Sequence, residues 1–214
     1  MLLEEKSCVI VCAGELEGAV IERRPGELLI AADAGIRYLE EAGMEPDLIV
    51  GDFDSLGYTP ESGNVIYHRP EKDDTDTMLA VREGFERGFR SFRIYAGLGG
   101  RLDHTVANLQ TLAFIAENGG RGYLVGGKSV STVIKDSSIA FGGGRSGMIS
   151  VFCQGGDAEG VTIKGLKYEL EDAVLTASVP LGVSNEFTGR EALISVRSGR
   201  LLVVWQQDNA AETK

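Results

Sequence analysis

The pattern of apolar and polar residues changes near residue 127. Before that point, short apolar runs alternate with segments whose apolar residues recur about every 3.6 positions, as in helices. The apolar runs are Cys8–Cys12, Leu28–Ala31, Leu48–Val50, Val65–Tyr67, Phe92–Tyr95 and Tyr123–Val125. Strands that alternate with helices form mostly parallel sheets. We therefore expect an α/β domain with a mostly parallel sheet over residues 1–127.

Residues 128–214 have no helical periodicity. Their short alternating or apolar runs are separated by glycine-rich turns. These runs are Ser131–Ile134, Met148–Phe152, Val161–Ile163, Ala173–Leu175, Leu193–Val196 and Leu201–Trp205. The pattern is typical of antiparallel strands. It predicts a smaller antiparallel β-sandwich domain over residues 128–214, with a polar tail from residue 206 and Trp205 packed inside the domain.

Three segments of the first half are predicted to be helices. The first contains Ile36 and Leu39. The other two have one apolar face each, formed by Met78, Val81, Phe85 and Phe89 in one and by Val106, Leu109, Ala113 and Ala116 in the other. One of Asp73, Asp74 and Thr75 is expected to be the N-cap of the second helix, because short polar side chains satisfy the first backbone N–H groups.

The most informative feature is a pair of acids, Asp52 and Asp54, at the end of the run Leu48–Val50. If the chain is still extended there, both side chains point to one side, and Phe53 points to the other. Two converging carboxylates suit Mg²⁺, which binds through one or two carboxylates, water and substrate phosphate. An isolated Asp-x-Asp also fits a turn whose acids cap the next helix.

Other strand ends carry similar residues. The acids of Glu71–Thr77 are crowded, and crowded acids repel each other unless a cation or solvent separates them. A glycine cluster, Gly97–Gly100, precedes a helix, and free N–H groups at a helix N-terminus can bind an anion. It matches neither GxGxxG nor Walker A. Asp33 ends another strand, or caps the helix that follows it. Ligands bind beyond the carboxyl ends of parallel strands, so these segments can converge on one site.

These segments together resemble a known family, the bacterial-type thiamine pyrophosphokinases (thiamine diphosphokinases). The matching segments, in the same order and spacing, are Ala32–Gly35, Pro46–Leu56 (PDLIVGDFDSL), Lys72–Asp76 and Gly99–His104. Residues 165–168 and 181–187 match as well, so the resemblance covers most of the chain. Ala34 stands where the family usually has glycine, and a methyl group that narrows the nucleotide pocket would change nucleotide preference.

The resemblance implies transfer of a diphosphate group from ATP to the hydroxyl of thiamine, giving thiamine diphosphate and AMP. It implies Mg²⁺ as the cofactor, with Asp52, Asp54 and Asp76 as ligands. Asp103 is expected to act with these three catalytic acids, either as a further ligand or by orienting its loop. The residues expected to bind ATP and its phosphates are Asp33, Lys72, Asp73, Thr75, Gly99, Gly100 and Arg101.

The resemblance also implies a homodimer in which thiamine binds between the β domain of one subunit and the nucleotide domain of the other. In that site Ser184 and Asn185 would form hydrogen bonds to the aminopyrimidine, and Phe187 would contact a ring. Considered without the family, Ser184-Asn185 is a turn and Phe187 is a core residue.

Composition limits the partners. The chain of 214 residues has 32 Asp and Glu against 21 Lys and Arg, a formal net charge of -11. This balance argues against nucleic acid or an anionic membrane as the main partner. It suits a cationic substrate, and the thiazolium ring of thiamine is a cation. No run approaches the roughly 18 apolar residues of a membrane span, and we do not expect the acidic N-terminus to be a signal peptide. We expect a cytoplasmic protein.

Cysteine and histidine limit the metal chemistry. Cys8, Cys12 and Cys153 lack Cys-x-x-Cys spacing and are expected to be buried free thiols. With only His68 and His104 in the chain, a histidine-based metal centre is excluded.

Two other functions remain open. One is another Mg²⁺-dependent nucleotide transferase of the Asp-x-Asp type, such as a nucleotide-sugar glycosyltransferase, which would leave Asp73–Asp76 unexplained. The other is a catalytically silent module that binds a nucleotide or another ligand on the same scaffold. A phosphatase of the haloacid dehalogenase type is disfavoured, because Ser55-Leu56 follows Asp54 where that family usually has Gly-Thr or a similar pair.

Overall fold

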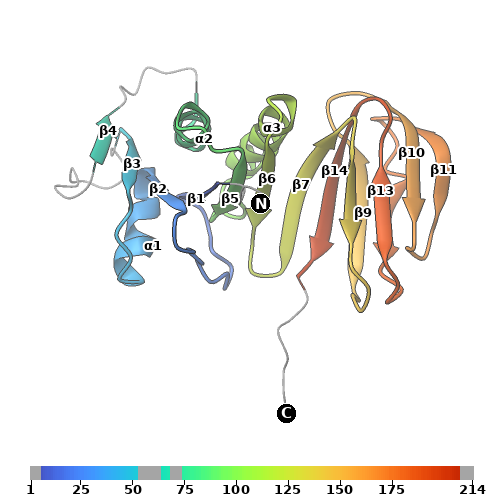
Figure 1. Ribbon diagram of the computed structural model, residues 1–214, viewed down its shortest axis with the longest axis horizontal. Helices are drawn as coiled ribbons and strands as arrows, with labels where there is room; N and C mark the ends of the chain where they lie inside the picture. The colour runs from blue at the N-terminus through green and yellow to red at the C-terminus, as the bar shows by residue number, and fades with distance from the viewer. Residues whose placement is uncertain (1–5, 53–63, 68–73, 208–214) are drawn as a thin grey trace, which may run out of the picture. The chain divides into compact units, whose positions relative to one another are not determined.

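The computed structural model describes residues 6–52, 64–67 and 74–207 (Figure 1). The chain divides into two compact units, residues 1–127 and 128–214. The first combines a parallel sheet with helices, and the second consists of antiparallel strands. This is the fold class that the sequence predicted.

The sheet of the first unit has six parallel strands among the described residues. They are β1 (Ser7–Val11), β2 (Leu28–Ala32), β3 (Leu48–Gly51), β4 (Asn64–Tyr67), β5 (Ser91–Tyr95) and β6 (Arg121–Val125). Their order is β6-β5-β1-β2-β3-β4, and each neighbouring pair is parallel. Because β1 lies between β2 and β5, the direction in which strands are added reverses beside it. Such a switch point is where open parallel sheets bind ligands, beyond the carboxyl ends of the strands.

Helices cover both faces of this sheet (Figure 1). They are the short η1 (Asp33–Gly35) followed by α1 (Ile36–Glu41), α2 (Asp76–Glu86) and α3 (Leu102–Glu117). Ile36 and Leu39 of α1 pack on the strand face formed by Val9, Val11, Leu29, Ala31 and Ile49. On the opposite face, α2 approaches closely at Gly84, where a β-carbon would lie 2.5 Å from the ring of Phe92.

The helix predictions are partly confirmed. Thr75 is the N-cap of α2, and its hydroxyl accepts a hydrogen bond from the Met78 N–H at 3.2 Å. The helix ends at Glu86, so Phe89 lies beyond it. The predicted apolar face of α3 is wrong at Val106, which is 48% exposed. The buried residues of α3 are Asn108, Thr111, Leu112, Ala113 and Ile115.

The second unit contains two antiparallel groups of four strands. The first runs in the order β12 (Gly182–Glu186), β9 (Met148–Cys153), β14 (Arg200–Gln206) and β7 (Ser129–Lys135). The second runs in the order β11 (Leu170–Leu175), β10 (Ala158–Lys164), β13 (Ala192–Ser195) and β8 (Ser138–Phe141). The Phe141 ring lies 5.3 Å from the Trp205 ring, centre to centre, so the two groups pack face to face as a sandwich. Trp205 is buried there, as predicted.

Two strands of this unit were not predicted. β8 is only four residues long. β12 has two buried residues, Gly182 and Asn185, and its register on β9 shifts between them. Ser184 within this irregular stretch has φ of +58°. The segment that looked like a turn is therefore an irregular strand, and its buried polar residue conceals the alternation that identifies strands.

The cysteines agree only in part with the expectation of buried free thiols. Cys8, Cys12 and Cys153 are free thiols; the first two are buried and the third is half-buried. In the described part of the chain, no helix combines the length and the apolar character needed to cross a membrane.

Candidate active site

A cavity of about 560 Å³ lies at the carboxyl ends of the parallel strands in the first unit. It is lined by the residues that follow β1, β2, β3 and β5 and by the first turns of α2 and α3. Both its size and its position at the switch point are typical of small-ligand sites in parallel α/β sheets.

The structure brings together many residues that the sequence singled out. Those that line the cavity are Asp33, Asp52, Thr75, Asp76, Gly99, Gly100 and Arg101. Asp103 lies beside Arg101 and is not among the described lining residues. Asp54, Lys72 and Asp73 lie outside the described residues. Segments from four strand ends, far apart in sequence, therefore share one cavity.

The end of β1 also forms part of this wall. Hydrogen bonds join Cys12 N to Tyr95 O (2.9 Å), Gly14 N to Ala96 O (2.9 Å) and Glu15 N to Leu98 O (3.2 Å). A β-carbon on Gly14 would lie 2.5 Å from Ala96 O, so only glycine allows the two segments to approach this closely.

Several lining residues were missed by the sequence analysis: Cys12, Ala13, Gly14, Glu15, Tyr38, Thr77, His104 and Asn108. Tyr38 donates a hydrogen bond from its hydroxyl to Gly14 O at 2.7 Å. The signal for the segment after β1 was Ala13-Gly14 directly after the apolar run Cys8–Cys12. Glu15 directly follows Gly14, so this strand end combines glycine and an acid just as the predicted site segments do.

Ala34, which departs from the family pattern, does not line the cavity in the described structure. It packs against the apolar core between the sheet and α1. The next residue, Gly35, tolerates no side chain, because a β-carbon there would lie 2.0 Å from Val11 O. The methyl group of Ala34 therefore does not narrow the pocket.

The cavity is acidic. Its described carboxylates are Glu15, Asp33, Asp52, Asp74 and Asp76, and its guanidinium is that of Arg101. Asp74 forms an ion pair with Arg82 of α2 at 2.8 Å. An anionic ligand would be repelled by the remaining acids unless a cation intervened. Carboxylate oxygens are the donors that Mg²⁺ prefers, so this lining fits a divalent cation chemically. Within the described ranges, no three acidic, histidine or cysteine side chains are already gathered as a metal site.

Arg101 and Asp103 form a two-point ion pair at the start of α3. Arg101 Nη2 lies 2.6 Å from Asp103 Oδ2, and Arg101 Nε lies 3.2 Å from Oδ1. Asp103 Oδ1 also accepts from His104 N at 3.0 Å. The hydrogen bond with Arg101 lowers the pKa of Asp103 and raises the pKa of Arg101. Both carboxylate oxygens of Asp103 are therefore engaged by Arg101 in this structure.

Cys12 is a buried thiol in the cavity wall. Its Sγ lies 3.2 Å from Thr77 Oγ1, which joins the end of β1 to the first turn of α2. Burial raises the pKa of Cys12 to about 12. The thiol is therefore protonated at neutral pH and unsuited to act as a nucleophile.

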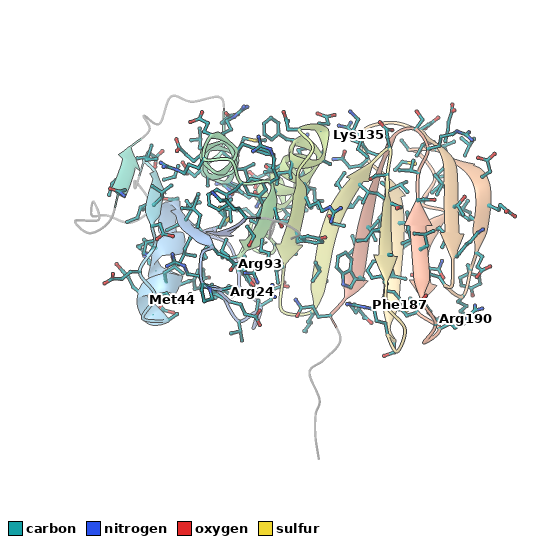
Figure 2. The ribbon with its side chains drawn as sticks, in the orientation of Figure 1. Arg24, Met44, Arg93, Lys135, Phe187 and Arg190 are labelled. Atoms are coloured by element: carbon teal, nitrogen blue, oxygen red, sulfur yellow. The ribbon has the colours of Figure 1, made fainter. Side chains whose placement is uncertain are left out.

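The three candidate thiamine-binding residues lie in the second unit and differ in exposure. Asn185 is 4% exposed; its side chain accepts from Tyr168 N and Glu186 N and donates to Tyr168 O at 2.7 Å. Phe187 is also buried and packs edge-on against Phe141, with the label in Figure 2 marking its place. Ser184 is exposed. The bonds of Asn185 hold residues 165–168 beside residues 181–187, so the two downstream segments of the family pattern are neighbours.

The fold and the site together define a class of protein: a parallel α/β unit with an acidic, glycine-lined cavity, followed by a separate antiparallel β-sandwich unit. Family models make the class specific. Residues 24–121 match the model described as "Thiamin pyrophosphokinase, catalytic domain", and residues 139–201 match "Thiamin pyrophosphokinase, vitamin B1 binding domain". Together these matches cover most of the chain, which belongs to the thiamin pyrophosphokinase family.

Individual relatives agree with this assignment. Thiamine pyrophosphokinase of Bacillus subtilis is 27% identical over 208 residues, which cover 85% of this chain and 88% of the relative. The crystal structure of the Bacillus subtilis enzyme is 25% identical and has a TM-score of 0.83 over 95% of this chain and 100% of that chain. The structure of the thiamin pyrophosphokinase from Geobacillus thermodenitrificans is 25% identical and has a TM-score of 0.81 over 95% of this chain and 99% of that chain.

Proposed function

We propose that this chain transfers a diphosphate group from ATP to the primary hydroxyl of thiamine, giving thiamine diphosphate and AMP. One observation carries the proposal: the catalytic-domain match covers residues 24–121 of the unit that contains the cavity, and the vitamin B1-binding match lies within the β-sandwich. A glycosyltransferase of the Asp-x-Asp type and a silent binding module are not favoured, because neither function accounts for a match to both family models.

The chemistry requires positioning more than covalent participation by the protein. The hydroxyl oxygen must reach the β-phosphorus in line with the departing oxygen of AMP, while charge on the phosphoryl oxygens is neutralised. The loop Gly97–Gly100 and the first turn of α3 lie in the cavity wall and offer backbone N–H groups to phosphate. Arg101, oriented by Asp103, supplies fixed positive charge. Lys72, Asp73, Asp33 and Thr75 complete the proposed ATP site.

We assign Mg²⁺ as the cofactor, with Asp52, Asp54 and Asp76 as its ligands. The support is the shared cavity of Asp52 and Asp76, the hard oxygen donors, and an acidic lining that would otherwise repel ATP. When bound, the cation would neutralise phosphate charge and help to orient the phosphoryl oxygens. Asp52 and Asp76 would hold it from the end of β3 and the start of α2.

Thiamine is assigned to the β-sandwich, where Ser184 is the exposed candidate contact. Exposed apolar side chains on the same two segments, Tyr168, Leu181 and Val183, suit an aromatic ligand. Asn185 and Phe187 support this surface from within. We further propose a homodimer whose thiamine site lies between the β-sandwich of one subunit and the nucleotide unit of the other. A cytoplasmic location accords with the free thiols.

The test is direct: the protein is incubated with Mg-ATP and thiamine, and the products are separated. Release of AMP together with thiamine diphosphate supports the proposal. Release of ADP or free phosphate would indicate another transferase or a hydrolase. Binding of both ligands without product would indicate a silent module.

A further inference from the structure

Asn108 is a polar residue on the buried side of α3 for which the sequence pattern gives no role. It is 5% exposed and lines the cavity. Its Nδ2 donates a hydrogen bond to the backbone oxygen of Gly97 at 2.7 Å. Because a carbonyl oxygen only accepts hydrogen bonds, this contact fixes which end of the amide faces the loop. The side chain thus joins α3 to the glycine loop that follows β5.

The neighbouring carbonyls of this loop are held by the end of β1. Tyr95, Ala96 and Leu98 accept from backbone N–H groups of the segment Cys12–Glu15. At Gly97 the partner is the side chain of Asn108 instead. The four carbonyls in sequence therefore have defined partners, and one of those partners depends on residue 108.

The conformation of the loop needs such support. Ala96 has φ of +52°, and Gly99 and Gly100 have φ of +75° and +62°. A positive φ in a residue other than glycine costs of order 1–3 kcal/mol, and it persists only where the surroundings impose it. The peptide bonds of the described residues are trans, and in a planar trans peptide the N–H points opposite to the preceding carbonyl. By holding Gly97 O, Asn108 fixes the direction of the Leu98 N–H and the path of the chain into Gly99 and Gly100.

We propose that Asn108 is a positioning residue for diphosphoryl transfer. Its amide holds the Gly97–Leu98 peptide and thereby keeps the loop in the conformation that accepts the polyphosphate of a nucleoside triphosphate. The inference rests on the proposed function of the cavity. Reacting groups lose roughly 100-fold in rate when displaced by about 1 Å, so a loop held by one buried hydrogen bond is a sensitive point.

The test compares Asn108→Asp with Thr111→Val. The aspartate keeps the size of asparagine but presents an anionic acceptor to Gly97 O in place of a donor. Thr111 is a matched control: it is 1% exposed on the same helix, and its hydroxyl bonds only to Ala107 O of that helix in the described contacts. Urea unfolding gives the folded fraction of each variant. Steady-state kinetics then give kcat and KM for ATP at saturating thiamine, and calorimetry gives the Kd values for a non-hydrolysable ATP analogue and for thiamine.

In folded protein, Asn108→Asp should lower kcat/KM for ATP roughly tenfold or more. It should also raise the Kd for the ATP analogue, while leaving the Kd for thiamine unchanged. Thr111→Val should lose stability but keep kcat/KM within about twofold. If Asn108→Asp does not fold, Asn108→Ala replaces it with the same expectation. Gly97→Ala should disturb the same loop, because its methyl group would lie 2.8 Å from Leu124 Cδ2 and 3.3 Å from Asn108 Nδ2. The losses of kcat/KM caused by Gly97→Ala and Asn108→Ala should therefore not multiply in the double variant.

Equal kcat/KM per folded molecule in the Asn108 variants and the wild type would overturn the proposal and leave Asn108 as a purely structural residue. Failure of the proposed function is a separate result, seen as a wild type that releases no AMP. In that case the Kd for the ATP analogue still decides whether Asn108 positions the loop.

Discussion

At the scale of single residues, chemically identical acids in and near the cavity differ in what surrounds them. Asp74 is paired with Arg82, and both carboxylate oxygens of Asp103 are engaged by Arg101. Sequence spacing predicted a group of acids near the nucleotide. It did not predict which acids an arginine would occupy, because that depends on how each helix leaves its strand. Asp52 and Asp76, which line the cavity, are the described acids proposed to hold the cation.

Asp52→Asn and Asp76→Asn should each lower kcat by about 100-fold or more, because each removes one charge from the proposed cation site while keeping side-chain size. The double variant should be little worse than either single variant, since the residues act as one unit. Asp54→Asn is expected to behave like them. Asp76 lies in the first turn of α2, so its replacement also costs up to about 1 kcal/mol of helix stabilisation. Kinetics and thermal unfolding on the same samples check this; activity lost only in proportion to folded protein would make these acids structural.

Glu27 provides a residue-scale prediction far from the cavity. Its carboxylate accepts hydrogen bonds from the Ser7 hydroxyl and from Arg24 N, and it pairs with Arg93; Figure 2 labels Arg24 and Arg93 close together. Burial raises the pKa of this carboxyl, but the hydrogen bonds and the arginine outweigh burial and hold the pKa below its ordinary value of 4.5.

The sign of the resulting pH dependence follows from linkage. Because the pKa of Glu27 is lower in the folded chain than in the unfolded chain, its stabilisation is complete above about 4.5 and is lost as the pH falls through the lowered folded value. Glu27→Gln should therefore cost about 1–3 kcal/mol of unfolding free energy at pH 7, and the difference from wild type should shrink below pH 4.5. Urea unfolding across that range measures it. A difference independent of pH would exclude the charge of Glu27 as the cause.

At the scale of elements, the regular apolar strands were easier to predict than the irregular strand β12 and the buried face of α3. Each of the six parallel strands overlaps one predicted apolar run. The runs in β1, β2 and β3 are continuously apolar because these strands are buried almost throughout. β12 escaped prediction because it is irregular and buries Asn185, a polar residue. The face of α3 was misassigned because Asn108 and Thr111 are polar yet buried, while Val106 is apolar yet exposed. Hydrogen bonds to Gly97 O and Ala107 O account for the buried polar residues, and no periodicity reveals such bonds.

The close approach of the ends of β1 and β5 can be tested at Gly14. Gly14→Ala would place a methyl group 2.5 Å from Ala96 O, so the two segments must separate. We expect a loss of about 1–3 kcal/mol of stability and a roughly tenfold or greater loss of ATP affinity in the folded protein. Gly142→Ala is the control, because a β-carbon there meets nothing within 4 Å. Unchanged ATP affinity in folded Gly14→Ala protein would remove the segment after β1 from the nucleotide site.

The irregular strand β12 predicts different outcomes for two adjacent residues. Ser184→Ala should weaken thiamine binding roughly tenfold and leave Mg-ATP binding and stability near wild type, since Ser184 is exposed. Asn185→Ala should instead destabilise the β-sandwich by about 1–3 kcal/mol, because it leaves Tyr168 N and Tyr168 O without their partner. Calorimetry and urea unfolding separate the two effects. If Ser184→Ala weakens both ligands equally, residues 181–187 support the fold and the acceptor site lies elsewhere.

At the scale of the whole molecule, the acidic composition and the two-unit division carry different information. The net charge of -11 argued against nucleic acid and anionic membranes but named no enzyme. The division at residue 127 placed the acidic cavity and the proposed thiamine surface in different units. Four strand-end segments were recognisable in sequence because acids and glycines mark them. The sequence did not reveal whether the two units of one chain, or units of two different chains, form a catalytic site together. No local pattern specifies whether a site is completed within one chain or between two.

A mixing experiment decides this last point. If the thiamine site spans two subunits, Asp76→Asn protein retains an intact β-sandwich surface and Ser184→Ala protein retains an intact nucleotide site, so a mixed dimer has one complete site. Random exchange makes about half of the dimers mixed, each with one good site of two, so activity at limiting thiamine should approach about a quarter of the wild-type value. Sedimentation across a dilution series should show that activity follows the dimer. A mixture no more active than the sum of its components, or a monomer with full specific activity, would place the complete site within a single chain.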